Sequence, residues 1–583
     1  MIDDIHEPLE QYATDLKTAH ANNVSDFFED LVRQSGVDEN ANVQTVQELR
    51  KLEQQVEGAS SANRWWRVLR GLVVALALSA LVYVLVAYSW PWMILPTAIS
   101  APVIYLLSRV IRDSHARRNA LEQARDAKRA EAWGQMAPLN RLFDWDIAAK
   151  LVQKTLPCIA FDPYFANGRM EELRENFGLS VELADDRSVV FSHSGVLNGN
   201  PFILARMLTH WMGRKTYKGS LEIKWITPVR GSDGEWRTET HYETLYASVE
   251  KPFPEYGNQT FVVYGNEAAP DLQFSRSPSE LSKLGDGFFD RRRTNRAIKK
   301  LEKKSRDIGG GSTFAVMSNR EFDAVFGATD RNDEVQFRLL FTPLAQQEML
   351  KLLKDRHVGY GDDFSFTKND MINFVESVHM RQADIGGEPE KFCFYELAQT
   401  RAVFNRYHND FFHSFYFGIA PLLAIPLYQQ HRSHADIYKD TYASRSCFWE
   451  HEAIANFHGE EKFKHPECVT RSILKTASRV EGDGSQRVRV TATGYSCVER
   501  VDYVAVRGGD GRSHEVPVHW NDYSQVQQAS EMLLMERAPA DDDGRNPAAD
   551  DEEATLRAVF ERRGIEYRDA VVRRSIVSAV LPS

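Results

Sequence analysis

The sequence predicts a membrane-anchored α+β protein, with an N-terminal helical segment, a two-helix transmembrane hairpin and a large mixed α/β cytoplasmic region that ends in a β-meander. Two observations carry this prediction. The 38 residues between Arg70 and Arg109 contain no charged side chain, and strand-like and helix-like patterns alternate after residue 151. The mean hydropathy of −0.43 excludes a polytopic transporter, because most of the chain must be hydrated.

Two spans fit inside the uncharged stretch, residues 71–88 and residues 92–108. A helix of about 17 residues rises roughly 26 Å, close to the hydrocarbon thickness of a bilayer. Between the spans, Ser89-Trp90-Pro91-Trp92 combines helix-breaking and interfacial residues, which is typical of a turn at the membrane surface. The alternative is a helical hairpin buried in a globular core.

Arginines flank both spans, whereas the turn has none. The positive-inside rule therefore predicts a multi-pass protein of the inner membrane with both termini in the cytoplasm. Five cysteines without a CxxC pair agree with a reducing compartment. The flanking cations are Arg64, Arg67, Arg70, Arg109, Arg112, Arg117 and Arg118.

Composition and pattern divide the rest of the chain. The expected order is a cytoplasmic helical segment at 1–60, the spans at 71–88 and 92–108, a juxtamembrane helical segment at 109–150, an α/β domain at 151–380, a helical plus β-meander domain at 389–535, an acidic linker at 539–553 and a C-terminal segment at 554–583.

Within the α/β domain, the patterns predict short strands and helices in alternation. Thr342-Pro343 supplies an N-cap and a first-turn proline for one of the helices. The expected strands are 188–192, 220–226, 242–249, 313–317, 335–341 and 363–366, and the expected helices are 319–326 and 344–354. The β-meander is expected at 487–493, 498–506 and 514–520, with a glycine-rich turn at 507–511.

Residues 411–428 are uncharged and long enough to cross a membrane, but they contain two prolines and a histidine. A buried core helix, an interfacial contact and a third span are all compatible with this composition.

A zinc site is the candidate metal centre. Cys447 and His451 are four residues apart, so they share one face of a helix, and His465 and Cys468 flank a Pro-Glu turn. Two thiolates and two imidazoles satisfy a closed tetrahedral zinc site. Packing cysteines and surface histidines are the alternative. An HExxH site is excluded, because the histidine that follows His451-Glu452 is at position 458.

A basic run at residues 291–306 is the candidate binding surface. Nine lysines and arginines stand there against one acid, Glu302. Near an anionic membrane surface each cation contributes about 1 kcal/mol, which predicts contact with the inner leaflet. Nucleic acid and a plain solvated helix are the alternatives. The predicted contact residues are Arg291, Arg292, Arg293, Arg296, Lys299, Lys300, Lys303 and Lys304.

The stretch 319–353 resembles a segment of a bacterial family of unknown function, whose members carry two transmembrane helices before a large cytoplasmic α/β domain. The resemblance rests on a pattern of apolar positions and covers the hairpin and residues 150–380. It implies an architecture and no activity.

No motif for nucleophilic catalysis or phosphate binding is present in the sequence. The sequence therefore favours a non-enzymatic binding or scaffold protein that contacts the lipid bilayer and an unknown protein partner, with no cofactor except a structural zinc. A membrane-tethered, metal-dependent hydrolase or nuclease is the alternative.

Overall fold

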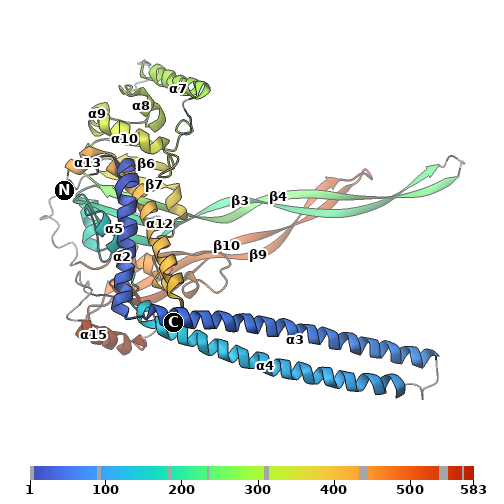
Figure 1. The fold of residues 1–583 in the computed structure, drawn as a ribbon. Helices are drawn as coiled ribbons and strands as arrows, with labels where there is room; N and C mark the ends of the chain where they lie inside the picture. Colours follow the sequence, from blue (N-terminus) through green and yellow to red (C-terminus); the bar gives the residue numbers. More distant parts are fainter. Residues whose placement is uncertain are drawn as a thin grey trace. The chain divides into compact units, whose positions relative to one another are not determined.

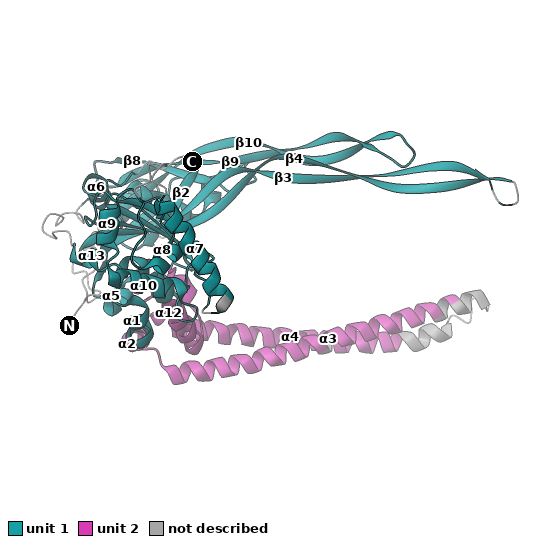
Figure 2. Ribbon diagram, turned by 90° about the horizontal axis from the view of Figure 1, so that it is seen from above, with its two compact units in different colours: residues 1–20, 148–386, 410–583 teal, residues 21–147, 387–409 magenta. Residues whose placement is uncertain are grey.

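The structure is a computed structural model that describes residues 5–582, except 88–93, 181–184, 231, 233–234, 286, 307–313, 432–443, 538–548 and 568–569. Helices make up 46% of the chain and strands 30% (Figure 1). The chain forms two compact units (Figure 2). Unit 1 comprises residues 1–20, 148–386 and 410–583, and unit 2 comprises residues 21–147 and 387–409.

Unit 2 is built around a long helical hairpin. The helix α2 (Lys17–Ser35) ends at Gly36, whose φ of 67° suits glycine and stops the helix. The helices α3 (Glu39–Ala87) and α4 (Ile94–Asn140) then run antiparallel. Glu48 pairs with Lys128 at 2.8 Å and Glu53 with Arg129 at 2.7 Å, so charges on the two helices fix their register.

The transmembrane hairpin predicted at residues 71–88 and 92–108 is wrong. Among the residues that the structure describes, no helix combines the length and the apolar character that a bilayer crossing requires. The error came from treating the uncharged stretch as two short helices. Its described residues belong to helices of 49 and 47 residues that are polar over much of their length.

This correction extends to every prediction that depended on the hairpin. The membrane-anchored fold class and the multi-pass location in the inner membrane lose their basis with it. The predicted turn at Ser89-Trp90-Pro91-Trp92 lies outside the described residues.

Unit 1 contains two antiparallel sheets. The first has the order β1-β2-β3-β4-β7-β6-β5 and the second the order β11-β12-β10-β9-β8. The strands of the first sheet are β1 (Ile159–Phe161), β2 (Arg187–Leu197), β3 (Asn200–Arg230), β4 (Trp236–Gly265), β5 (Gln273–Arg276), β6 (Phe364–Asn369) and β7 (Ile372–Ser377). Those of the second are β8 (Ile473–Val480), β9 (Gln486–Arg507), β10 (Ser513–Glu536), β11 (Val571–Arg573) and β12 (Ile576–Val580).

Helices of unit 1 cover these sheets. The helix α14 (Phe448–His458) contributes Ala453 to one hydrophobic cluster, with residues of β2 and β3, and Ile454 and Ala455 to another, with residues of β8 to β10. The other helical elements include α1 (Pro8–Gln11), the π-helical η1 (Tyr12–Leu16), α5 (Ile147–Thr155), α6 (Asn167–Glu175), α7 (Phe288–Arg306), α8 (Arg320–Phe326), α9 (Glu334–Leu340), α10 (Pro343–Lys354), α11 (Val378–Gln382), α13 (Pro426–Gln430), η6 (Glu460–Lys462) and α15 (Ala549–Arg562).

The segment 411–428 is part of the hydrophobic core. It lies in α12 (Leu397–Leu423) and α13, and the side chains of Phe415 and Tyr416 are fully buried. Tyr416 donates a hydrogen bond to the carbonyl oxygen of Pro8 at 2.7 Å. The buried-core alternative is therefore the correct interpretation of this uncharged run.

Two predicted strands of the α/β domain are wrong. Residues 335–340 fall in helix α9 and Phe341 follows its end, because the Asp333 side chain accepts hydrogen bonds from the amides of Val335 and Gln336 and so caps a helix. The described residues 314–317 form no strand. The predicted cap of α10 is confirmed, since Thr342 accepts from the amide of Ala345 and Pro343 opens the helix.

Two long hairpins of unit 1 pack against each other and form what we call the β arm, residues 210–260 of β3 and β4 and residues 494–531 of β9 and β10 (Figure 2). The strands predicted at 487–493 and 498–506 are one continuous strand, β9. Ile223 and Leu245 of the first hairpin form a buried cluster with Val516 and Val518 of the second.

A polar cluster and a close glycine contact complete this junction. Lys251 pairs with Asp502 at 2.6 Å and lies 4.1 Å from the centre of the Trp520 ring, and the Trp520 indole donates to Asp502 at 2.9 Å. At Gly219, an added Cβ would lie 2.0 Å from the carbonyl oxygen of Pro517. The two hairpins therefore approach so closely that only glycine fits.

We expect Gly219→Val to force the two hairpins apart, because the Pro517 carbonyl oxygen is backbone and cannot rotate away. The free energy of unfolding, measured in urea, should fall by about 1–3 kcal/mol. Ser220→Val is the matched control, since Ser220 is the next residue and is exposed. Equal stability of the two variants would contradict this packing.

Candidate functional site

The predicted basic run forms a single helix, α7 (Phe288–Arg306; Figure 1). Its cations lie on the exposed side. Ala297, Ile298 and Leu301 are half-buried and form the side that faces the protein. The helix is amphipathic, and its outer surface is almost purely cationic. Phe289, at the start of the helix, is 77% exposed.

Three contacts fix α7 to the protein. Glu302 pairs with Arg320 of α8 at 2.7 Å. Lys304 donates to the carbonyl oxygen of Thr329 at 2.9 Å, and its ammonium lies 5.4 Å from the centre of the Phe314 ring. Lys304, one of the eight predicted contact residues, thus helps to attach the helix.

The other seven predicted contact residues remain on the surface. Each is exposed, and none has an ion-pair partner among the residues that the structure describes. They are Arg291, Arg292, Arg293, Arg296, Lys299, Lys300 and Lys303. Their charge is therefore available to an external anion.

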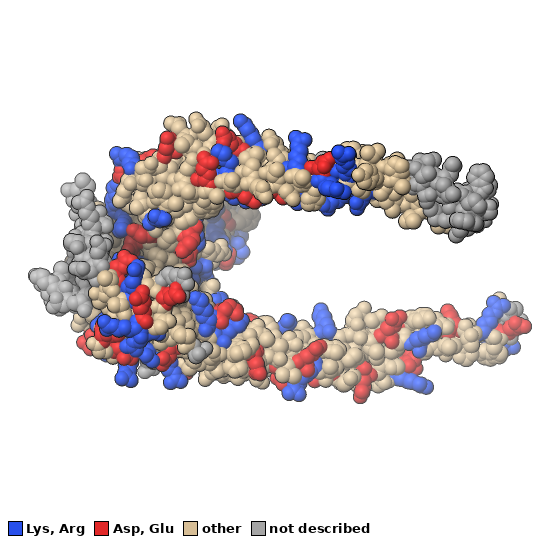
Figure 3. Space-filling view, turned by 90° about the horizontal axis from the view of Figure 1, so that it is seen from below, with Lys and Arg blue, Asp and Glu red and all other residues tan. Residues whose placement is uncertain are grey.

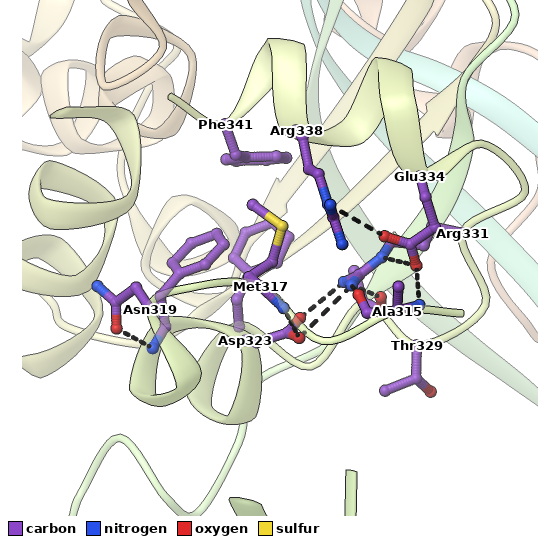
Figure 4. A network of polar contacts seen from close by, with 12 residues as sticks. Ala315, Met317, Asn319, Asp323, Thr329, Arg331, Glu334, Arg338 and Phe341 are labelled. Carbon is purple, nitrogen blue, oxygen red and sulfur yellow. Dashed lines mark hydrogen bonds and ion pairs between the residues drawn. The ribbon is translucent and has the colours of Figure 1, made fainter. Parts of the chain in front are cut away.

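The segment to which α7 is attached is organised by one buried arginine, Arg331 (Figure 4). Its side chain is fully buried and pairs with Asp323 at 2.7 Å and with Glu334 at 2.8 Å. The rings of Phe314 and Phe337 lie 4.4 and 4.2 Å from the guanidinium. Two carboxylates, one on α8 and one on α9, are thereby bridged by a single cation.

The same carboxylates also hold the backbone that precedes α8. Asp323 accepts a hydrogen bond from the amide of Met317 at 3.0 Å, and Glu334 accepts one from the amide of Ala315 at 2.8 Å. Arg331 donates to the carbonyl oxygen of Ala315 at 2.8 Å. Because side chains satisfy these backbone groups, the segment needs no strand partner, which explains why the predicted strand does not form.

A second buried arginine, Arg276, fixes α8 to the sheet. It pairs with Asp362 at 2.7 Å and donates to the carbonyl oxygens of Phe364 at 2.6 Å and Phe326 at 3.2 Å. Burial lowers the pKa of Arg276, and the Asp362 carboxylate opposes that shift. The platform beneath α7 is thus fixed at two points.

Removing Arg331 should destabilise the platform. We expect Arg331→Met to lower the free energy of unfolding by about 3–5 kcal/mol, because it leaves the buried Asp323 carboxylate without its cation and leaves Glu334 with only the long contact to Arg338. Urea unfolding and amide hydrogen exchange in α8 and α9 measure this loss. Arg338→Met is the control, since Arg338 is half-exposed and lies 4.0 Å from Glu334; a loss as large in this variant would contradict the account.

The four predicted zinc ligands are not placed around a common point, and three of them make hydrogen bonds with protein groups. Cys447 precedes α14 and is buried, and burial raises the pKa of its thiol well above the usual range. The Nε2 atom of His451 is hydrogen-bonded to Ser446 Oγ at 3.1 Å, while burial lowers its pKa to about 4. Cys468 Sγ lies 3.4 Å from the carbonyl oxygen of Thr470, and His465 Nδ1 accepts from the amide of Glu467.

The structure does not gather these residues into a ligand set. Throughout its described part, the chain holds no group of three or more histidine, cysteine, aspartate or glutamate side chains placed to bind a metal ion. The zinc site stays a prediction that the described geometry does not support.

Sequence reasoning missed the buried carboxylates of α14. Glu450 lies 3.5 Å from Arg573 and 3.4 Å from Arg574 and accepts from Ser192 Oγ at 2.9 Å. Glu452 pairs with Lys475 at 2.9 Å, and burial raises its pKa to about 7. The sequence could not predict these ion pairs, because Arg573 and Arg574 are more than a hundred residues away from Glu450 along the chain.

The raised pKa of Glu452 predicts a pH-dependent stability. The folded protein keeps a proton on Glu452 that the unfolded chain has already lost, so the free energy of unfolding should fall as pH rises from 5 to about 7. The neighbouring His451 acts in the opposite sense, because its pKa is lowered. We therefore compare wild type with Glu452→Gln by urea unfolding at each pH. The stability of the variant relative to wild type should increase with pH, and a constant difference would contradict the assignment.

The comparisons with known proteins give no relative. The chain matches no protein-family model, no curated protein and no solved structure. The resemblance of residues 319–353 to a bacterial family therefore gains no support, and any function must be argued from the residues of this chain.

Proposed function

We propose that this chain is a binding or scaffold protein that docks on an anionic lipid surface through α7. The observation that carries the proposal is the outer surface of this helix, which presents seven exposed lysines and arginines without an ion-pair partner among the described residues. The chain as a whole has a net charge of −11, so this concentration of cations is a local feature. Each cation near an anionic bilayer contributes about 1 kcal/mol.

The spacing of the cations suits a flat surface. Arg292, Arg296, Lys299 and Lys303 are separated by four, three and four residues, so they form one stripe along the helix. A flat array of negative headgroups can meet the whole stripe at once. Phe289 lies exposed beside its first turn and can enter the interface between headgroups and acyl chains.

Nucleic acid is the less favoured partner. Proteins that bind single strands combine cations with several aromatic platforms on which successive bases stack. On α7 one aromatic side chain, Phe289, is described as exposed, and it lies at the end of the helix, before the cations. A metal-dependent hydrolase or nuclease also lacks support, since the described residues contain no metal-ligand group.

Vesicle binding tests the proposal. Reversing Arg291, Arg292 and Arg293 to glutamate should weaken binding to phosphatidylcholine vesicles that contain phosphatidylglycerol by at least about tenfold. Binding of the wild type should also decline with added salt, because the exposed charges are screened. Sedimentation with vesicles at several salt concentrations measures both effects.

A variant with Arg214, Lys218 and Lys224 changed to glutamate is the matched control. These three cations are exposed on the β arm, so the change in net charge is the same. Equal loss of binding in this control, or undiminished binding of the α7 variant, would contradict the proposal. So would tighter binding of the wild type to a DNA fragment than to the vesicles.

A further inference from the structure

Within unit 2, the helices α3 and α4 leave a groove of about 730 Å³ between them. Three of its lining residues are small, Gly58 and Ala59 of α3 and Ser114 of α4, so the space between the two helices is left unfilled there. An added Cβ at Gly58 of α3, which lines the groove, would meet no atom within 4 Å. This size is typical of a site for a small ligand.

The lining of the groove combines apolar walls with one cation. Trp66 of α3 and Val110 and Leu121 of α4 line the groove, and Arg117 of α4 lines it too. Arg117 is exposed and has no ion-pair partner in the part of the chain that the structure describes. Asp113 also lines the groove and is the one carboxylate among its lining residues.

Further arginines raise the positive potential around the groove. All of them are exposed, and none forms an ion pair with another described residue. In Figure 3, blue side chains gather on this hairpin beside an uncharged, tan stretch. The further arginines near the groove are Arg64, Arg67 and Arg70 of α3 and Arg109 and Arg112 of α4.

Past these arginines the surface of the hairpin is apolar. Leu72 and Leu76 of α3 are 57% and 68% exposed, and Leu106 of α4 is 58% exposed. A cationic groove thus adjoins an exposed apolar surface. A molecule that fits both must have an anionic head and an apolar chain.

We propose that the groove between α3 and α4 binds one anionic amphiphile, whose phosphate head pairs with Arg117 and whose chain lies along Trp66 and Val110. This site is separate from α7 and does not depend on the function proposed for that helix. Asp113 limits the affinity, because its carboxylate lies in the same groove as the anionic head.

The probe is dodecyl phosphate below its critical micelle concentration, titrated calorimetrically into the full chain. Gly58→Leu should fill the groove and reduce the affinity at least about tenfold, while the helix itself should become more stable, because leucine is a better helix former than glycine. Arg117→Glu should weaken binding similarly, and Asp113→Asn should strengthen it. Gly134→Leu is the matched control, because Gly134 is likewise inside a helix of this hairpin, α4, has open space at its Cβ and does not line the groove.

Three outcomes would overturn the proposal. Unchanged binding in Gly58→Leu, with its helix content retained by circular dichroism, would show that the amphiphile binds elsewhere. Equally tight binding of neutral dodecyl maltoside would remove the role of Arg117. If inorganic phosphate bound as tightly as dodecyl phosphate, the alkyl chain would contribute nothing to binding, and the groove would be a site for simple anions. None of these results depends on α7, whose vesicle test uses different variants.

Discussion

The burial of Arg331 is the interaction on which the proposed binding surface depends. A fully buried guanidinium can be stable only where its charge and its donors are satisfied, and here Asp323, Glu334 and the carbonyl oxygen of Ala315 satisfy them. This requirement ties α8 and α9 together and explains why the segment before α8 is irregular. The helix α7 is attached to that platform through Glu302 and Lys304, so its outer cations are free for a partner.

The two hairpins of the β arm show a second constraint, which is steric. Strands of this length, 31 and 30 residues in β3 and β4, have too few neighbours of their own sheet to be covered along their whole length. The second hairpin, β9 and β10, covers one side of the first through Ile223, Leu245 and the close approach at Gly219. Charges of both signs are interspersed along the arm (Figure 3), in contrast with the single sign of the α7 surface.

Local signals in the sequence were reliable where a cap or a turn residue defined the element. Asn319 and Thr342-Pro343 each mark the start of a helix, and the structure confirms both. Predictions from hydrophobicity alone were weaker. The uncharged run after Arg70 predicted a membrane hairpin that the described helices do not support, and residues 335–341 look strand-like until the cap at Asp333 is recognised. The basic face of α7 was predictable from the spacing of its lysines and arginines. The burial of Arg331 was not predictable, because its nearby acidic partners look like ordinary surface charges. The ion pairs of Arg276 and Glu450 were not predictable either, because their partners are distant in the sequence.

Measuring where α7 lies when the protein meets a lipid surface tests the central claim most directly. A nitroxide on Asn295→Cys, an exposed position of this helix, reports contact with vesicles by electron paramagnetic resonance without changing the charge of the cations. We expect its motion to decrease, and its collisions with lipid-dissolved oxygen to increase, when phosphatidylglycerol vesicles are added, while a label on Ser248→Cys of the β arm stays unchanged. A label at Asn295→Cys that does not respond while the protein is bound to the vesicles would contradict the account.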